Sequence, residues 1–304
     1  MATLQYTGTS GLGANILTDV YLEKSFISRL ISTLVCTPLG MRSSLPDNTG
    51  KKVRWQYSSQ PAALSATTEG TNPSDNTFST TTAEGTLLEY KSEMEASRFL
   101  LKAGLSAWLE EVVDATGYQM ADTFDTASLT ALDASTVTVD AGTSMTADAV
   151  RQGVQKLVMA NVKPHPSTPG GRFYAGIFSG EAAYDMMGEG APAWFQVKSS
   201  DYQAALITPF DGTPATAAIY GAIIKISNNV RAQTSEDYNV IVGKEAFGIA
   251  ALDTNVVQPA VYVTRPNERV DLPARNKGSV GTFALFVAKL IDTNRVVMVK
   301  SDVS

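Results

Sequence analysis

Apolar residues recur with the spacing of a helix in three parts of the chain. Positions 27, 30, 31 and 34 follow the i, i+3, i+4, i+7 spacing of one helix face, so residues 27–34 are predicted to be helical. From about 98 to 132, apolar side chains recur every three or four residues and predict a long amphipathic helix. A third helix is predicted to start at Thr146, whose hydroxyl is suited to cap it, and to end before Pro164.

Strand-like patterns fill much of the remaining chain. Residues 51–57 alternate polar with apolar or aromatic side chains, as a half-buried strand does, and residues 173–178 form a short apolar run typical of a buried strand. A short helix is predicted over 180–187. Further strand-like runs lie at 218–226, 239–242, 261–263, 283–290 and 295–299. Because helices and strands mix without strict alternation, the pattern indicates an α+β fold rather than a doubly wound parallel sheet.

The segment 58–82 differs in composition from the rest of the chain. Of its 25 residues, 12 are Ser or Thr, none is Lys or Arg, and its one run of apolar side chains is Ala62-Ala63-Leu64. Such a segment cannot bury enough apolar surface to fold compactly by itself. Strand-like residues on both sides of it predict a long hairpin from about 45 to 90, which is either solvated or laid on another surface.

Charge is distributed unevenly along the chain. Overall, 24 basic residues stand against 30 acidic ones, and the net charge of −6 argues against a surface that broadly attracts nucleic acid. Between residues 84 and 148, however, 12 residues are acidic and only 3 are basic. The predicted long helix carries part of this excess, and one of its faces is predicted to be strongly acidic. The acidic residues of interest on it are Glu110, Glu111, Asp114 and Asp122.

The chain offers little for catalysis. A single Cys36 and a single His165 cannot supply the ligands of a zinc site, and no P-loop, nucleophile elbow, metalloprotease or EF-hand motif is complete. A Ser-His-Asp triad would have to use His165, between two prolines, where a solvent-exposed loop histidine is the simpler interpretation. We therefore expect no enzyme activity, no metal and no cofactor.

Signals for membrane insertion and secretion are also absent from the sequence. No run of 18 or more apolar residues occurs, so no membrane span is expected. The first residues lack a basic segment followed by an apolar one, which favours synthesis inside the cell without a secretory signal.

One tight cluster of basic residues lies on the predicted hairpin. Lys51, Lys52 and Arg54 adjoin Trp55 and Tyr57, a combination that could stack single-stranded nucleic acid. The neighbouring chain supplies no further bases for such a site, whereas the acidic region after residue 84 offers complementary charge. A salt-bridge patch between subunits, on a projecting hairpin, is therefore the preferred interpretation.

The order of these parts is similar to that of a known fold. A flexible N-terminal arm, a long polar hairpin, a long acidic helix, a mixed α+β body and a C-terminal return of strands resemble the major capsid protein of tailed bacteriophages, with the Hong Kong 97-type or Johnson fold. Short motifs resemble the family found in short-tailed phages and prophages: Leu45-Pro46-x-x-x-Gly50-Lys51-Lys52-Val53-Arg54, Glu69-Gly70-x-Asn72-Pro73-Ser74, residues 80–90, 220–229 and 242–248, Gly278-Ser279-Val280-Gly281-Thr282-Phe283-Ala284 and Asn294-Arg295-Val296-Val297.

The resemblance implies a domain plan and a structural role. The expected parts are an N-terminal arm over 1–40, an extended loop over 41–92, a peripheral domain with the spine helix over 93–145, an axial domain over 146–280, and strands over 281–304 that return to the peripheral domain. Hexamers and pentamers of such a protein tile an icosahedral phage head around double-stranded DNA, without sequence-specific binding. The expected location is the virion, after assembly in the host cytoplasm.

Further expectations about partners and contacts follow from the same resemblance. A separate scaffold protein or none is expected, since the arm starts almost at the first residue, and portal and decoration proteins are further expected partners. Contacts between subunits are expected on the extended loop, and the acidic helix face is expected to line the interior toward DNA. The loop residues are Lys51, Lys52, Arg54, Trp55, Tyr57 and Glu69, and the helix residues are Glu110, Glu111, Asp114 and Asp122.

Three other interpretations remain open at this point. An encapsulin-like compartment would keep the fold and enclose a cargo enzyme instead of DNA. A carboxylate-dependent hydrolase would use some of the many acidic residues, although no complete catalytic motif supports it. A tail-tube or other virion structural protein is compatible with the same composition.

Overall fold

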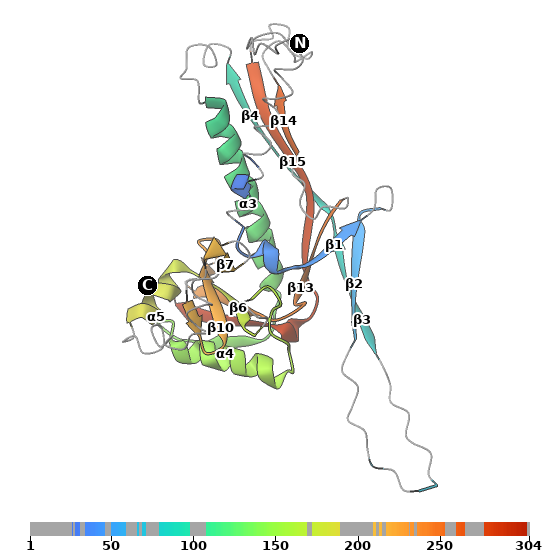
Figure 1. Ribbon diagram of the computed structural model, residues 1–304, viewed down its shortest axis with the longest axis vertical. Helices are drawn as coiled ribbons and strands as arrows, with labels where there is room; N and C mark the ends of the chain where they lie inside the picture. The colour runs from blue at the N-terminus through green and yellow to red at the C-terminus, as the bar shows by residue number, and fades with distance from the viewer. Residues whose placement is uncertain are drawn as a thin grey trace, which may run out of the picture.

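The chain forms a compact lobe, an elongated strip and a projecting arm (Figure 1). The computed structural model describes residues 26, 28–30, 34–45, 50–58, 66, 69–70, 79–97, 108–168, 172–188, 209–210, 213–214, 217–230, 232–233, 236–252, 260–264 and 277–302. Helices and strands are mixed in both large parts, which confirms the predicted α+β class.

The lobe is built on a seven-stranded mixed sheet. Its strands follow the order β5-β16-β12-β6-β10-β9, and β11 pairs with β12. β10 is parallel to β6, whereas β12 is antiparallel to both β6 and β16. The strands are β5 (Thr138–Asp140), β6 (Tyr174–Phe178), β9 (Ala217–Ile219), β10 (Ala222–Ile226), β11 (Ala232–Gln233), β12 (Glu236–Val242) and β16 (Val296–Asp302). A separate small pair is formed by β7 (Pro209–Phe210) and β8 (Thr213–Pro214).

Both faces of this sheet are covered. On one face, α4 (Ala147–Met159) and α5 (Gly180–Gly188) pack against Phe178, Ile224 and Ile241. Successive strand residues point to opposite faces, so Ile177 lies in a different core from Phe178. As predicted, the Thr146 hydroxyl caps α4 by accepting a hydrogen bond from the backbone N–H of Ala149, at 3.2 Å.

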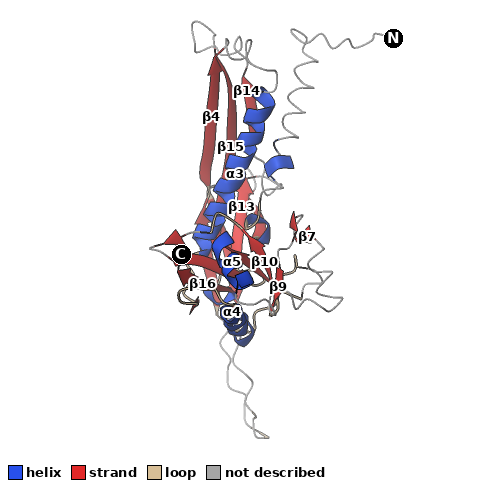
Figure 2. Cartoon of the chain, turned by 90° about the vertical axis from the view of Figure 1, so that its left-hand side faces the viewer, coloured by secondary structure: helices blue, strands red, loops and turns tan. Residues whose placement is uncertain are grey.

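The strip is a long sheet with one helix along it. β15 (Lys277–Leu290) is its central strand, β4 (Leu88–Ser97) pairs along one side, and β13 (Phe247–Leu252) and β14 (Ala260–Thr264) share the other. β1 (Met41–Leu45) adds to β13 in parallel. The helix α3 (Trp108–Leu132) runs beside β4 and β15 (Figure 2). Phe124 of α3 stacks on Phe286 of β15, with ring centroids 4.6 Å apart.

One hydrophobic core joins the strip to the lobe. It contains Val113 and Phe124 from α3, Phe286 from β15, and Ile177 and Val240 from the second face of the lobe sheet. Burial of apolar side chains from both parts in one cluster holds the two parts together as a unit. The two terminal strands divide between them, because β15 lies in the strip and β16 lies in the lobe.

The N-terminal segment is held against α3 by a buried carboxylate. Asp125 is 1% exposed and accepts hydrogen bonds from the backbone N–H groups of Val35 (2.6 Å), Cys36 (3.1 Å) and Thr37 (2.9 Å), and from the Thr37 hydroxyl (2.8 Å). Thr37 begins the short 3₁₀ helix η1 (Thr37–Leu39). Burial raises the pKa of Asp125, and these hydrogen bonds only partly offset that effect. Asp125 is therefore a structural anchor and not part of the acidic surface of the helix.

The strand pairings differ from the expected domain plan at three places. The projecting hairpin consists of β2 (Lys52–Ser58) and β3 (Thr80–Thr86), so it is narrower than the expected loop over 41–92, whose ends belong to the strip as β1 and β4. β13, expected in the axial domain over 146–280, pairs within the strip. β16, expected to return to the peripheral domain, pairs with β12 in the lobe. Sequence order does not reveal such pairings, because β partners are brought together only by folding.

Candidate assembly surfaces

The arm is a two-stranded antiparallel hairpin that leaves the body beside the strip (Figure 1). At its root, Val53, Trp55 and Leu87 are buried against Ala250, Val287 and Ile291 of the body. Farther out, Gln56, Ser58 and residues 80–82 are exposed. The arm therefore presents polar surface and unpaired strand edges away from its own chain.

The basic cluster of the arm is only partly free for contacts with other molecules. Lys51 and Lys52 are exposed, whereas the guanidinium of Arg54 forms an ion pair with Glu84 of β3, with Nε and Oε1 2.7 Å apart. These two residues face each other in the strand register. The expected salt bridge from Arg54 to another subunit thus has a competing partner within the arm itself.

The aromatic residues of the arm lie differently from the expectation. Trp55 is 3% exposed, and its indole N–H donates a hydrogen bond to the Ser43 hydroxyl at 2.9 Å. It fills the core of its own chain, which leaves little of its side chain for the expected contact between subunits. Tyr57 is half-buried at the edge of a groove, and Glu69 lies exposed in a turn with Gly70. No aromatic platform for stacking bases accompanies the lysines among these described residues.

The acidic residues of α3 do not all contribute to one surface. Glu111 and Asp114 are exposed, and Asp122 is half-buried where α3 meets β4. Asp114 lies 3.6 Å from the guanidinium of Arg29. The side chain of Glu110 lies outside the described residues. The predicted acidic face is thus confined to the N-terminal half of the helix and is partly neutralised by the N-terminal segment.

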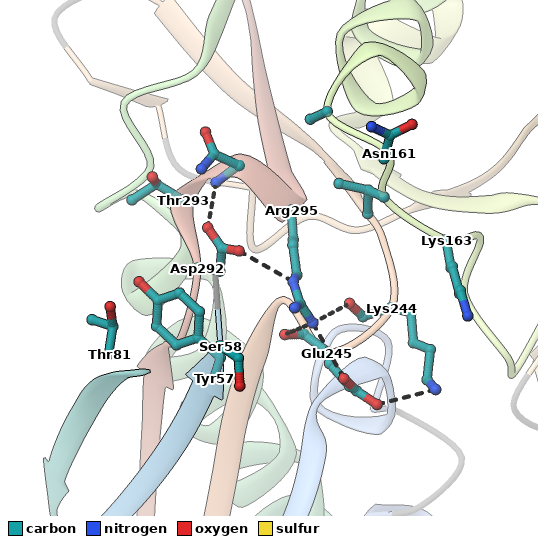
Figure 3. Close-up of a pocket in the computed structure, with 13 residues that line it drawn as sticks. Tyr57, Ser58, Thr81, Asn161, Lys163, Lys244, Glu245, Asp292, Thr293 and Arg295 are labelled. Carbon is teal, nitrogen blue, oxygen red and sulfur yellow. Dashed lines mark hydrogen bonds and ion pairs between the residues drawn. The ribbon is translucent and has the colours of Figure 1, made fainter. Parts of the chain in front are cut away.

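A polar groove lies between the arm and the lobe (Figure 3). It has a volume of about 760 Å³, and Tyr57, Ser58 and Thr81 of the arm form one side of it. On the other side, residues 160–163 follow α4, and residues 244–245 and 292–295 form two turns. No motif in the sequence pointed to this groove, because its walls come from five separate segments.

Charged side chains cross-link the turns that line this groove. Arg295 pairs with Asp292 and with Glu245, each at 3.2 Å, and Lys244 pairs with Glu245 at 3.1 Å. Partial burial raises the pKa of Glu245, but hydrogen bonds and charge from Lys244 and Arg295 outweigh this and lower the pKa overall. The network fixes the link between β12 and β13, and thereby the passage of the chain from lobe to strip.

The candidate catalytic histidine is a structural residue. His165 is 4% exposed, so the expectation of a solvent-exposed loop histidine is wrong. Its Nδ1 accepts a hydrogen bond from the Ser167 N–H at 3.2 Å, which leaves Nε2–H to donate to the carbonyl of Leu39 at 2.9 Å. The ring thus connects the lobe with η1.

The part of the chain that the structure describes also lacks a reactive thiol, a metal site and a membrane-spanning helix. Cys36 is buried, and this burial, together with the nearby Asp125, raises the pKa of its thiol, which disfavours a reactive thiolate. No group of three or more His, Cys, Asp or Glu residues there could hold a metal ion. None of the described helices is long and apolar enough to cross a membrane.

Comparison with known proteins identifies the fold. No protein-family model and no curated protein matches the sequence. Among solved structures, the capsid of Ralstonia phage GP4 is similar with a TM-score of 0.69 and 12% identity, over 89% of this chain and 88% of that chain. The chain has a phage capsid fold. This agrees with the Hong Kong 97-type fold expected from the resemblance of the sequence.

Two further phage capsids are similar to this chain over most of its length. The capsid of cyanophage P-SCSP1u has a TM-score of 0.61 and 12% identity, with 88% of this chain and 87% of that chain covered. The head of Helicobacter pylori bacteriophage KHP40 has a TM-score of 0.58 and 11% identity, with 86% of each chain covered. The shared fold therefore covers most of the chain and not only one of its parts.

Proposed function

We propose that this protein is the structural major capsid protein of a phage head, and that many copies assemble into an icosahedral shell around double-stranded DNA. The observation that carries the proposal is the capsid fold over 89% of the chain. Hexamers and pentamers of the same chain would form this shell. A non-enzymatic role fits the buried His165 and Cys36.

The arm provides the physical basis for assembly. Beyond the buried root, Gln56, Ser58 and residues 80–82 are exposed, so this part of the arm gains buried surface when it lies on another molecule. Its exposed strand edges can pair with a neighbour, and Lys51, Lys52 and Glu69 supply charges for that contact. Many identical contacts of this kind, repeated around closed rings, produce a shell from one chain.

Electron microscopy of the purified full-length chain, after size-exclusion chromatography, tests this proposal. We expect particles of uniform diameter, formed either from this chain alone or after co-expression with a separate scaffold protein of its source genome. A stable monomer of 32.3 kDa under both conditions, with hydrolytic activity, would instead favour the hydrolase. Particles from the natural source that contain an enzyme and no DNA would favour the encapsulin-like compartment.

The acidic part of α3 is proposed to face the packaged DNA. Glu110, Glu111, Asp114 and Asp122 would then repel the DNA backbone within about a Debye length, which lets the DNA move during packaging. Reversal of these four residues to Lys should reduce DNA packaging or retention while shells still form. Reversal of exposed acidic residues of the lobe, such as Asp140 and Asp302, serves as the control. If the helix variant changes only shell assembly, this orientation is wrong.

A further inference from the structure

The indole of Trp55 contacts the second strand of the arm and joins the arm to two strands of the strip. A Cβ atom added at Gly248 of β13 would lie 2.3 Å from Cε2 of Trp55, and one added at Gly85 of β3 would lie 3.0 Å from its Cζ3. The indole therefore lies against the bare backbone of two glycines in different elements, where no other residue would fit without a shift. The hydrogen bond to Ser43 adds a link to β1.

Full burial along the arm ends at this residue. Trp55 faces Ala83 in the strand register, and Val53 and Gly85 on the body side are buried. On the far side, Tyr57 is half-buried against the edge of the same cluster, and Gln56, Ser58 and residues 80–82 are exposed. The rung of Trp55 and Ala83 is thus the last one with a fully buried side chain among the described residues. The direction of the arm depends on how this rung is held.

The length of the arm amplifies any change at its root. There are 27 residues between Trp55 and Ala83, so each half of the hairpin can reach at most about 45 Å, at about 3.3 Å per residue. The displacement caused by a tilt grows with the distance from the root, so a change of angle at Trp55 moves the outer residues of the arm more than the inner ones.

We propose that Trp55 is a positioning residue for assembly: clamped between Gly85 and Gly248 and hydrogen-bonded to Ser43, it sets the angle at which the arm leaves the strip. This inference rests on the proposed function, in which the arm contacts a second copy of the chain. Trp55 orients the arm and does not itself touch the second copy, because its side chain is buried.

Spin labels on the unassembled full-length chain test the angle directly. Labels are attached to Thr80→Cys on the arm and Gln119→Cys on α3, two exposed positions, while the single native Cys36 is buried. Pulsed dipolar spectroscopy then gives the distribution of distances between them. We expect Trp55→Ala to widen this distribution at least twofold. A distribution identical to that of the wild type would overturn the proposal.

Matched variants separate positioning from general loss of stability. Leu157→Ala removes a fully buried side chain of the lobe and should leave the distance distribution unchanged. Gly248→Ala adds a methyl group against the indole and should shift the mean distance. If Trp55→Ala does not fold, Trp55→Phe and Gly248→Ala provide the test, and an unchanged distribution in both would refute the proposal.

Shell formation supplies the second readout. We expect the yield of closed shells to fall at least tenfold in Trp55→Ala, with irregular aggregates or open sheets in their place, and to stay near wild type in Leu157→Ala. Closed shells at normal yield with a widened distribution would refute the role in assembly. Because the label measurement needs no assembly, it remains valid even if the wild type forms no shell, so the two proposals fail independently.

Discussion

The lobe and the arm are both built from β-strands, yet their side chains are buried in opposite ways. Every residue of β6 is buried, because helices cover one face of its sheet and α3 with the strip covers the other. In β2, only alternate residues near the root are buried, and the outer rungs are exposed. The lobe thus gains its stability from its own chain, whereas the arm has to gain it from a neighbour. Fold and assembly are supported by different parts of the molecule.

The largest loss of stability is expected in the lobe, from Ile241→Ala. Ile241 is fully buried in the core between the sheet and α4. Its truncation leaves a cavity and should lower the free energy of unfolding by about 4 kcal/mol. The matched variant Ile241→Val should cost about 1 kcal/mol. Urea denaturation measures both, and equal values for the two variants would contradict a tightly packed lobe core.

The next largest loss of stability is expected from Asp125→Ala. This change leaves the N–H groups of Val35, Cys36 and Thr37 without their buried acceptor and should cost about 3 kcal/mol. Asp125→Asn retains one acceptor oxygen and should cost less. Hydrogen exchange should also show faster exchange at residues 35–37 than in the wild type. Unchanged protection there would contradict the anchoring role.

Shortening the arm should raise the free energy of unfolding, whereas the two substitutions above lower it. Ser58 and Thr80 face each other in the register, so an Asn-Gly turn can replace residues 59–79. Each halving of a loop lowers the entropic cost of closure by about 0.6 kcal/mol, so we expect a gain of up to about 2 kcal/mol. Sedimentation should show that the shortened chain no longer assembles. Normal shells from this variant would refute the role of the arm.

The smallest change in stability is expected from Glu245→Gln, in the turn between lobe and strip. The folded state lowers the pKa of Glu245, so its carboxylate stabilises the fold above its ordinary pKa of 4.5, and this contribution is lost as the pH falls through the lowered value. Wild type should be slightly more stable than Glu245→Gln at pH 7, and the difference should shrink as the pH falls below 4.5. High salt should also reduce the difference at pH 7, because these charges are partly exposed. A difference independent of pH would exclude this electrostatic origin.

Local patterns in the sequence predicted many elements correctly. The cap at Thr146, the buried strand β6, the short helix α5 and the alternation of β2 all follow from residue types within a few positions of one another. The positions of Asp125, Trp55 and His165 did not follow in this way. In the sequence, Asp125 is only one of the 12 acidic residues between 84 and 148, while Trp55 is predicted to contact another subunit and His165 to lie exposed in a loop. Each is buried by a segment at least 80 residues away or by a separate strand.

The sequence by itself determined the class of the protein: an α+β chain with a long helix, a Ser/Thr-rich hairpin and no complete catalytic motif. These properties are local, because periodicity and composition act over a few residues. Only the tertiary structure decided which strands share a sheet, that β16 ends in the lobe while β15 lies in the strip, and that the arm is clamped at Trp55 between two glycines. Such contacts depend on packing between distant segments, since a side chain is buried by whatever the fold brings against it.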